Sequence, residues 1–372
     1  PILNSCLKAL RDKEDTLIIW KLDGLGRNLY HLIEIVRQLE LQKVGFHVIT
    51  GKGSCIDTST ASGKMIFSIF GTLSEYEREL ISERIKAGLN AARWDLKASI
   101  LEYVMHDKEF VWPDRFDVTI QNTEFMSNIF RRLVAVCLKH NAVPIGGMAT
   151  ALPSKDEEVN IEAAKSIKAD KEWEANQGFI RAWVAHIYHM DPASEPFKKL
   201  RESGWEPTEE MKNPDNYPVK IDNPNGTLTK EGTRQNIRTL LEYIEGWLNG
   251  RGAKGIDRLA GKPGKRPALM EDLATARIST GQIAQRIIHK SFSEDTEQEH
   301  SYKLVKEIIL DETKDIIKLL GENASDDQIN KYEDSCKIAM QWIKNYTEFN
   351  FRSLGSYSRK DLDDIANEKD AF

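Results

Sequence analysis

The spacing of apolar residues predicts alternating strands and helices in the first part of the chain. Residues 16–20 and 45–49 are short runs rich in β-branched and aromatic side chains, which is typical of buried strands. Between them, residues 29–41 place apolar side chains at the spacing of an amphipathic helix. A strand, a helix and a strand in this order predict a parallel pair. Residues 64–92 contain no proline and are expected to form one long helix.

The pattern changes after residue 93, where strands and helices alternate in half of a β/α series rather than a complete one. The predicted strands are 116–120, 142–145 and 181–187, and the predicted helices are 125–140 and 159–176. Residues 191–229 are rich in proline, asparagine, aspartate and glycine, which indicates a linker or crossing segment. From residue 230 onward the spacing is mostly helical. The helices expected there are 230–249, 279–290, 298–321 and 325–345.

Composition adds limits to this picture. The chain has 372 residues, of which 40% are hydrophobic and 30% charged, as in ordinary globular proteins. Its net charge is -6, and the acidic excess lies entirely after residue 93, so that part is expected to bind nucleic acid poorly. No apolar run approaches the length of a membrane span, and no membrane partner is expected. The four cysteines are far apart, which favours reduced thiols and a cytoplasmic location.

A motif near the first predicted strand resembles a known family. Residues 20–28 read WKLDGLGRN, which resembles the KLDRLGRS signature of serine recombinases of the resolvase and invertase type. Residues 56–64 and 75–84 follow in the order that this family shows. The resemblance covers about residues 1–92. It implies a truncated resolvase-like catalytic domain whose long helix serves dimerisation and approach to DNA.

The recombinase chemistry requires a nucleophilic serine and several arginines that stabilise the charge on the attacked phosphate. In this family the serine lies on the first strand, upstream of any matching residue here. One of the two signature arginines is replaced by Gly24, and only Arg27 remains. We therefore interpret Asp23 and Arg27 as relics that stabilise a loop. DNA strand exchange is not expected, and DNA is an unlikely partner.

The rest of the chain carries a second resemblance. Residues 88–95 read GLNAARWD, which resembles the GLNCGRWD motif of A-type malate synthases. Further stretches that resemble this family, in its order, are 112–115, 146–153, 168–172, 183–186, 229–232, 236–238 and 270–279. The match covers about residues 87–372 and corresponds to the C-terminal half of that family. Residues 88–90 also suit the recombinase helix, so the two pieces join where they are alike.

Together the two resemblances imply an α/β fold in four segments. A partial resolvase-like α/β domain precedes the C-terminal half of a (β/α)8 TIM barrel, a linker and an all-α C-terminal domain. The expected boundaries are 1–92, 93–190, 191–229 and 230–372. Half of the barrel strands are not represented, which leaves open sheet edges. We therefore expect that the protein can self-associate, through these edges or through the long helix.

The malate synthase resemblance implies a reaction. The family condenses acetyl-CoA with glyoxylate and hydrolyses the thioester, which gives malate and CoA in the glyoxylate cycle, with Mg²⁺ as cofactor. Asp272 matches the catalytic base, and its apolar neighbours are expected to raise its pKa. The alternative is an ordinary Asp before a helix, with Ser279 and Thr280 as the capping residues.

Other residues match positions around that base. Asp95 matches one of two carboxylates that hold Mg²⁺, and the alternative is a surface Asp beside Arg93. Trp94 belongs to the segment that receives the glyoxylate carboxylate. Substrate-contacting positions are matched by Trp94, Met148, Trp183 and Met270. Aromatic and Met side chains in such positions are equally often core residues.

Several departures from the family predict severe impairment. Residues 65–70, at the place of the second metal carboxylate, contain no acid, and the catalytic arginine has no counterpart. The motif around Trp183 lacks the family's Asp-Gly and its closing Pro. His186 and His189 are interpreted as a surface or core pair rather than metal ligands, and the basic block 261–266 as a solvated insertion.

Three interpretations remain open from the sequence. The first is a malate synthase-like acyltransferase with an incomplete active site. The second is a resolvase-like DNA recombinase or DNA-binding protein that lacks its nucleophile. The third is a gene fusion with neither activity.

Overall fold

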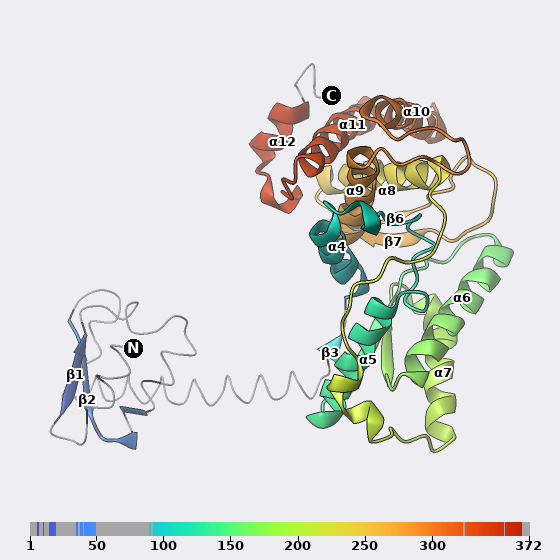
Figure 1. Ribbon diagram of the computed structural model, residues 1–372. Coiled ribbons are helices and arrows are strands. Elements are labelled where there is room, and N and C mark those ends of the chain that lie inside the picture. The colour runs from blue at the N-terminus through green and yellow to red at the C-terminus, as the bar shows by residue number, and fades with distance from the viewer. Residues whose placement is uncertain are drawn as a thin grey trace. The chain divides into compact units, whose positions relative to one another are not determined.

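The computed structural model describes most of the chain after residue 91 and only short stretches before it. The described residues are Cys6, Leu10, 15–19, 35, 38–39, 41–49, 89–90, 92–322, 324–352 and 354–366. The chain divides into two compact units, Pro1–Ala87 and Gly88–Phe372, and each is treated by itself (Figure 1).

The first unit contains two parallel strands, β1 (Thr16–Ile19) and β2 (Gly45–Val48). Leu17 of β1 pairs with Phe46 of β2, and both side chains are buried, as the apolar runs predicted. The parallel pairing is therefore confirmed. Asp23 and Arg27 lie outside the described residues, so their interpretation stays a prediction. The long helix expected over 64–92 also lies outside them, except at its end, where Leu89–Asn90 form a strand, so that end was wrong.

The second unit begins with a three-stranded parallel sheet in the order β3-β4-β5. The strands are β3 (Leu89–Asn90), β4 (Pro144–Ala149) and β5 (Arg181–Val184). Its helices are α5 (Glu124–Lys139), α6 (Glu157–Asn176) and α7 (Met190–Glu202). Strand, helix, strand and helix follow one another as in part of a (β/α)8 barrel. The predictions for α5 and α6 are confirmed, β4 begins two residues later than expected, and β5 ends at Val184, three residues before the predicted end.

Two local predictions in this region were wrong. Residues 116–120 do not form a strand, because the Asp117 carboxylate accepts hydrogen bonds from the backbone N–H and the hydroxyl of Thr227 at 3.1 and 2.8 Å. The stretch is a loop fixed to a distant segment. Residues 191–202 belong to helix α7 although prolines suggested a linker. Pro192 lies in its first turn, where a missing N–H costs little, and Pro196 lies inside the helix.

The remaining elements form a helical region. Its helices are α4 (Arg93–Val104), α8 (Lys230–Leu248), α9 (Leu273–Ile288), α10 (Tyr302–Leu320), α11 (Asp326–Thr347) and α12 (Arg359–Ala366). Two antiparallel strands that the sequence did not predict, β6 (Ala253–Ile256) and β7 (Leu269–Asp272), lie before α9. Short 3₁₀ turns occupy Lys108–Phe110, Ile187–His189, Glu210–Lys212, Pro214–Asn216 and Leu354–Ser356. The domain boundaries at 190 and 229 stay predictions.

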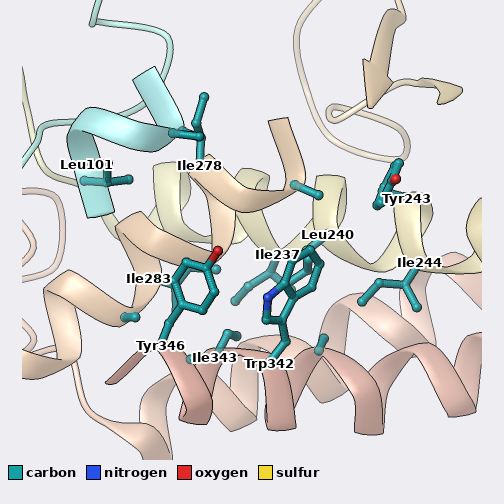
Figure 2. Packing of buried hydrophobic residues seen from close by; sticks show 14 of the residues in the cluster. Leu101, Ile237, Leu240, Tyr243, Ile244, Ile278, Ile283, Trp342, Ile343 and Tyr346 are labelled. Carbon is teal, nitrogen blue, oxygen red and sulfur yellow. The ribbon is translucent and has the colours of Figure 1, made fainter. Parts of the chain in front are cut away.

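The core of this region lies between α8, α9, α11 and α4 (Figure 2). Ile237 and Leu240 of α8 meet Trp342 and Tyr346 of α11, and all four side chains are buried. Each such side chain contributes about 1.5–3 kcal/mol on burial. Gly281 lets α9 approach α4, because a Cβ at this position would lie 2.8 Å from Leu101 Cδ2. This packing fixes the start of α9 relative to the start of α4.

Candidate active site

Asp272 occupies the junction between β7 and α9. Its Oδ1 accepts a hydrogen bond from the backbone N–H of Thr275 at 3.2 Å, and the Thr275 hydroxyl accepts one from the Asp272 N–H at 2.9 Å. This reciprocal capping box makes Asp272 the first residue before the helix. The alternative in which Ser279 and Thr280 cap the helix is therefore wrong, because both are buried inside α9.

Asp95 lies in the first turn of α4, and Asp272 directly precedes α9, the helix that packs against α4. Although Asp95 is exposed to solvent, its pKa is raised by desolvation first and by repulsion from Asp272 second, while Arg277 acts in the opposite direction. Burial followed by the Asp272 charge raises the pKa of Tyr243 to about 12. The structure therefore brings together the two carboxylates that the sequence singled out.

An ion pair beside these carboxylates connects their helices. The Arg277 guanidinium of α9 donates to both oxygens of Glu102 on α4, at 3.0 and 2.6 Å. The Tyr346 hydroxyl of α11 donates to the same carboxylate at 2.7 Å. Since Arg277 follows Asp272 along α9 and Glu102 follows Asp95 along α4, this contact holds the two helix starts in register.

The ring of Trp94, the residue before Asp95 in α4, lies between two cations. Arg115 and Lys97 lie 4.9 and 4.7 Å from the centre of the Trp94 ring, at cation–π distance. The buried Arg115 also donates to Glu271 at 2.6 Å, directly before Asp272. Burial first, and then Arg93 and Arg115, lower the pKa of Lys97 to about 7. The Trp94 segment is thereby connected to the β7 strand.

Met148 and Trp183 are opposite each other in the β4–β5 register, with exposed fractions of 37% and 53%. Met148 and Trp94 line an open cleft of about 1000 Å³, whereas Trp183 does not. Met270 is half-buried, and its backbone N–H donates to Thr150 O at 2.8 Å. The structure thus brings Trp94 and Met148 to one cleft and leaves Trp183 on the open sheet edge.

The cleft has an excess of positive charge that sequence reasoning missed. Its cationic lining residues are Arg93, Lys97, Arg115, Arg258, Lys265 and Arg266, and its acidic ones are Glu162 and Asp170. The Arg258 guanidinium lies 3.3 Å from the centre of the Phe116 ring. Burial, followed by Arg115 and Arg266, lowers the pKa of Arg258 to about 10. Two of these cations, Lys265 and Arg266, belong to the basic block 261–266 and are exposed to solvent, as expected of a solvated insertion.

A buried ionic network supports the floor of the same cleft. Arg93 pairs with Asp170 at 2.8 Å, and Lys171 pairs with Glu174 at 2.9 Å with both side chains fully buried. Burial acts to raise the pKa of Asp170, but Arg93 and Lys171 overcome it and hold that pKa low. Glu174 Oε1 also accepts a hydrogen bond from the backbone N–H of Gly147 at 2.9 Å. The network holds the glycine pair of β4 in place.

The residues of the site do not complete a magnesium site. Among the described residues, no group of three or more His, Cys, Asp or Glu side chains is arranged to hold a metal ion. Asp272 Oδ1 is occupied by the helix cap, which leaves Asp95 as the less committed carboxylate. His186 is exposed and His189 is buried.

Family models match the chain in three consecutive segments. Residues 1–95 match the resolvase N-terminal domain, residues 75–223 the malate synthase TIM barrel domain, and residues 227–359 the malate synthase C-terminal domain. The first two matches overlap over residues 75–95, the stretch in which the structure also divides into two units. The predicted junction lies inside this overlap.

Curated relatives agree with these segments. Malate synthase A of Escherichia coli is 33% identical over 274 residues, which are 73% of this chain and 49% of the relative. Malate synthase of Myxococcus xanthus is 33% identical over 56% of this chain and 37% of its own length. A DNA-invertase of Escherichia phage P1 is 46% identical over 93 residues, which are 25% of this chain and 48% of the invertase. The chain thus spans about half or less of the relatives it matches.

Among the described helices, none has the length and apolar character that crossing a bilayer requires. The order of the three matches, the parallel β/α series and the helical region agree with the expected α/β fold. The chain therefore joins a resolvase N-terminal domain to part of a malate synthase, in which a segment of the TIM barrel is followed by the C-terminal domain.

Proposed function

We propose that this protein is a malate synthase-like acyltransferase that acts on acetyl-CoA and glyoxylate with severely reduced turnover. The observation that carries the proposal is the position of Asp95 and Asp272 at the starts of the two packed helices α4 and α9, in a segment similar to malate synthases. The α9 cap and the Arg277–Glu102 pair hold both carboxylates in place.

Asp272 is the proposed base for the acetyl methyl group. Its Oδ1 receives the Thr275 N–H, and no described residue donates a hydrogen bond to Oδ2. Oδ2 can therefore accept a proton from the methyl carbon of acetyl-CoA, while the cap fixes the direction of the carboxylate. Trp94, next to Asp95 in α4, lines a cleft whose cations would attract an anionic substrate, and neither Asp95 nor Asp272 is among the residues that line it.

The reduction in turnover follows from the groups that surround the pair. The enolate oxygen formed after proton removal needs a nearby cation, and Arg277 is already paired with Glu102. Loss of one such stabilising group typically lowers kcat by about 10²–10³-fold. Asp95 supplies one carboxylate for Mg²⁺, fewer ligands than a firmly bound ion requires, so weak Mg²⁺ binding is expected. The residues before the malate synthase match are similar to the resolvase N-terminal domain rather than to malate synthases.

Thiol release from acetyl-CoA, with glyoxylate and Mg²⁺ present, tests this proposal. The native chain should release CoA several orders of magnitude more slowly than E. coli malate synthase A, and Asp272→Asn should abolish the remaining rate. Slow exchange of the acetyl methyl protons in D₂O should also depend on Asp272, because proton removal by the base is the first step of both the exchange and the condensation. Equal rates in the native chain and in Asp272→Asn would show that Asp272 is not the base. If neither the native chain nor Asp272→Asn released CoA or exchanged the methyl protons, the protein would be a fusion without this activity.

A second candidate function comes from the 46% identity of residues in the first quarter of the chain to a DNA-invertase. We infer weak and salt-sensitive DNA binding without strand cleavage, because a few Lys and Arg contacts lose affinity quickly as salt rises. Supercoiled plasmid with recombination sites should stay intact when incubated with the protein. A covalent protein–DNA adduct would contradict this inference.

A further inference from the structure

Three arginines gather in the open cleft that Trp94 lines. We call Arg115, Arg258 and Arg266 the arginine cluster; all three line this cleft. Arg258 and Arg266 belong to the segment that joins β6 to β7, whereas Arg115 comes from the loop before α5. The guanidiniums of Arg115 and Arg258 lie 5.0 and 3.3 Å from the centre of the same Phe116 ring. Two segments far apart in the sequence thus bring their positive charges to one place.

The negative charge beside the arginine cluster does not balance it. Arg115 pairs with Glu271 at 2.6 Å, and both side chains are buried. Arg258 and Arg266 form no ion pair with any residue in the described part of the chain. Burial, and then the charges of Arg115 and Arg266, lower the pKa of Arg258, which shows that the three guanidiniums repel one another. A bound anion would relieve this repulsion.

The two buried arginines also have hydrogen-bond donors to spare. Arg115 is 3% exposed, and its Nε has no partner among the described residues. Arg258 is 7% exposed and donates from Nε to Gln235 Oε1 at 3.1 Å, while no described residue accepts a hydrogen bond from its terminal nitrogens. A buried donor without a partner is costly, because it has lost its hydrogen bonds to water. These donors are available to a ligand in the cleft.

Strand β7 separates the arginine cluster from the proposed base. Side chains along a strand point alternately to its two faces. Leu269 lines the cleft, and Glu271, two residues later, reaches Arg115 on the same face. Met270 and Asp272 alternate with them, and neither lines the cleft. A ligand on the cluster would therefore lie on the face of β7 opposite to Asp272.

We propose that the arginine cluster binds a compact phosphate group, as inorganic phosphate or as a small phosphate monoester, at a site separate from that of the proposed acyltransferase. A guanidinium can donate two parallel hydrogen bonds to a phosphate, and the phosphate oxygens point in several directions, so more than one arginine can bind it at once. A carboxylate is planar and carries a single charge, which balances less of the cluster. Because Arg115 and Arg258 are buried, the group that they hold is small. The exposed Arg266 completes the site from the solvent side.

Isothermal titration calorimetry of the full chain with inorganic phosphate, in a buffer of another kind, tests the proposal. Binding is expected, and added salt should weaken it. Arg258→Gln and Arg266→Gln should each lower the affinity at least about ten-fold, because each removes charge-assisted hydrogen bonds. Arg266→Lys keeps the charge without the paired donors and should lower it less. Arg251→Gln is the matched control, because Arg251 is an exposed arginine that does not line the cleft.

The same titration with glycerol 3-phosphate distinguishes the two sources of the phosphate group. Tighter binding than that of inorganic phosphate would assign the site to a monoester, whose organic part packs on the apolar lining of the cleft. Equal or weaker binding would assign the site to the free ion. Since Arg266 is exposed, its variants keep the test valid even if Arg258→Gln fails to fold.

Four results would overturn the proposal. The first is no heat of binding up to about 10 mM phosphate. The second is equal affinity of the native chain and Arg266→Gln. The third is equal weakening by Arg251→Gln and Arg266→Gln, which would indicate diffuse attraction to a charged surface. The fourth is displacement of phosphate by saturating acetyl-CoA, which would make the cleft part of the acyltransferase site. Asp272→Asn should bind phosphate as tightly as the native chain, so loss of turnover and loss of this site are measured separately.

Discussion

The helical region and the three-stranded sheet of the second unit differ in how far their apolar residues are covered. Trp342 of α11 is enclosed by α8 and α9, whereas Trp183 of β5 is 53% exposed (Figure 2). Both regions belong to the same malate synthase similarity. The helical region closes its own core within the chain, because helices satisfy their backbone hydrogen bonds locally. A barrel segment requires neighbouring strands for the same purpose, so only part of it is complete here.

The first test of this comparison uses the two tryptophans. Trp342→Ala should lower the free energy of unfolding by about 3–5 kcal/mol, because it removes a large buried side chain and leaves a cavity. Trp183→Ala, at an exposed position, should change it by about 0.5 kcal/mol or less. Urea unfolding followed by circular dichroism measures both. Similar losses in the two variants would mean that Trp183 is buried in solution.

A second test asks whether the sheet has a stable interior of its own. Glu174→Gln should cost about 3 kcal/mol, since it leaves the buried Lys171 with a weakened partner and removes the charge that receives the Gly147 N–H. Glu172→Gln on the exposed side of the same helix is the matched control and should have little effect. A small loss for Glu174→Gln would show that the network opens to water.

A third test concerns pH in the helical region. Burial, and the nearby Arg286, lower the pKa of His300, whose ring bonds to Ser291 O and the Thr233 hydroxyl at 2.8 Å each. Unfolded His300 binds a proton near pH 6.5, so below that pH the unfolded state holds more protons and stability falls. The slope from this group is at most about 1.4 kcal/mol per pH unit. His300→Gln should flatten the decline between pH 6.5 and 5, and an unchanged decline would exclude His300 as its source.

The fourth test concerns Asp272, the N-cap of α9, where the expected change in stability is the smallest. Asp272→Ala should lower the unfolding free energy by about 1 kcal/mol, because it removes the N-cap of α9. Asp272→Asn keeps a capping oxygen and should change stability by only a few tenths of a kcal/mol. Denaturant unfolding of both variants separates capping from base chemistry. Equal losses in the two variants would mean that the negative charge, rather than the cap, is what stabilises the helix.

The fold could be predicted best where amphipathic periodicity decides it. Helix α8 places Ile237, Leu240, Leu241 and Ile244 on one buried face, and its bounds were nearly right. Helix α9 begins at Leu273 rather than at residue 279, because the apolar run 269–274 contains both the end of a strand and the start of a helix. Helix α7 was missed since proline content was taken as a linker signal.

The site could be predicted only in part. Asp95 and Asp272 were found through motifs that resemble malate synthases, and the structure brings them together. The basic cleft was missed because Arg93, Arg115, Arg258 and Arg266 come from four separate segments and form no motif along the chain. Trp183 was expected near the substrate and stays a prediction; its side chain is exposed on β5 and does not line that cleft. Long-range assembly, rather than local pattern, decides these positions.

The capping box at Asp272 has a consequence for how such a chain changes over time. One carboxylate oxygen stabilises α9, and the other is available for chemistry. Selection for folding alone would therefore accept Asp, Asn or Ser here, because these residues cap helices about equally well. Of the three, only Asp also supplies a carboxylate that can act as a base. Exchange of Asp272 for Asn or Ser would thus remove the base and leave the start of α9 intact.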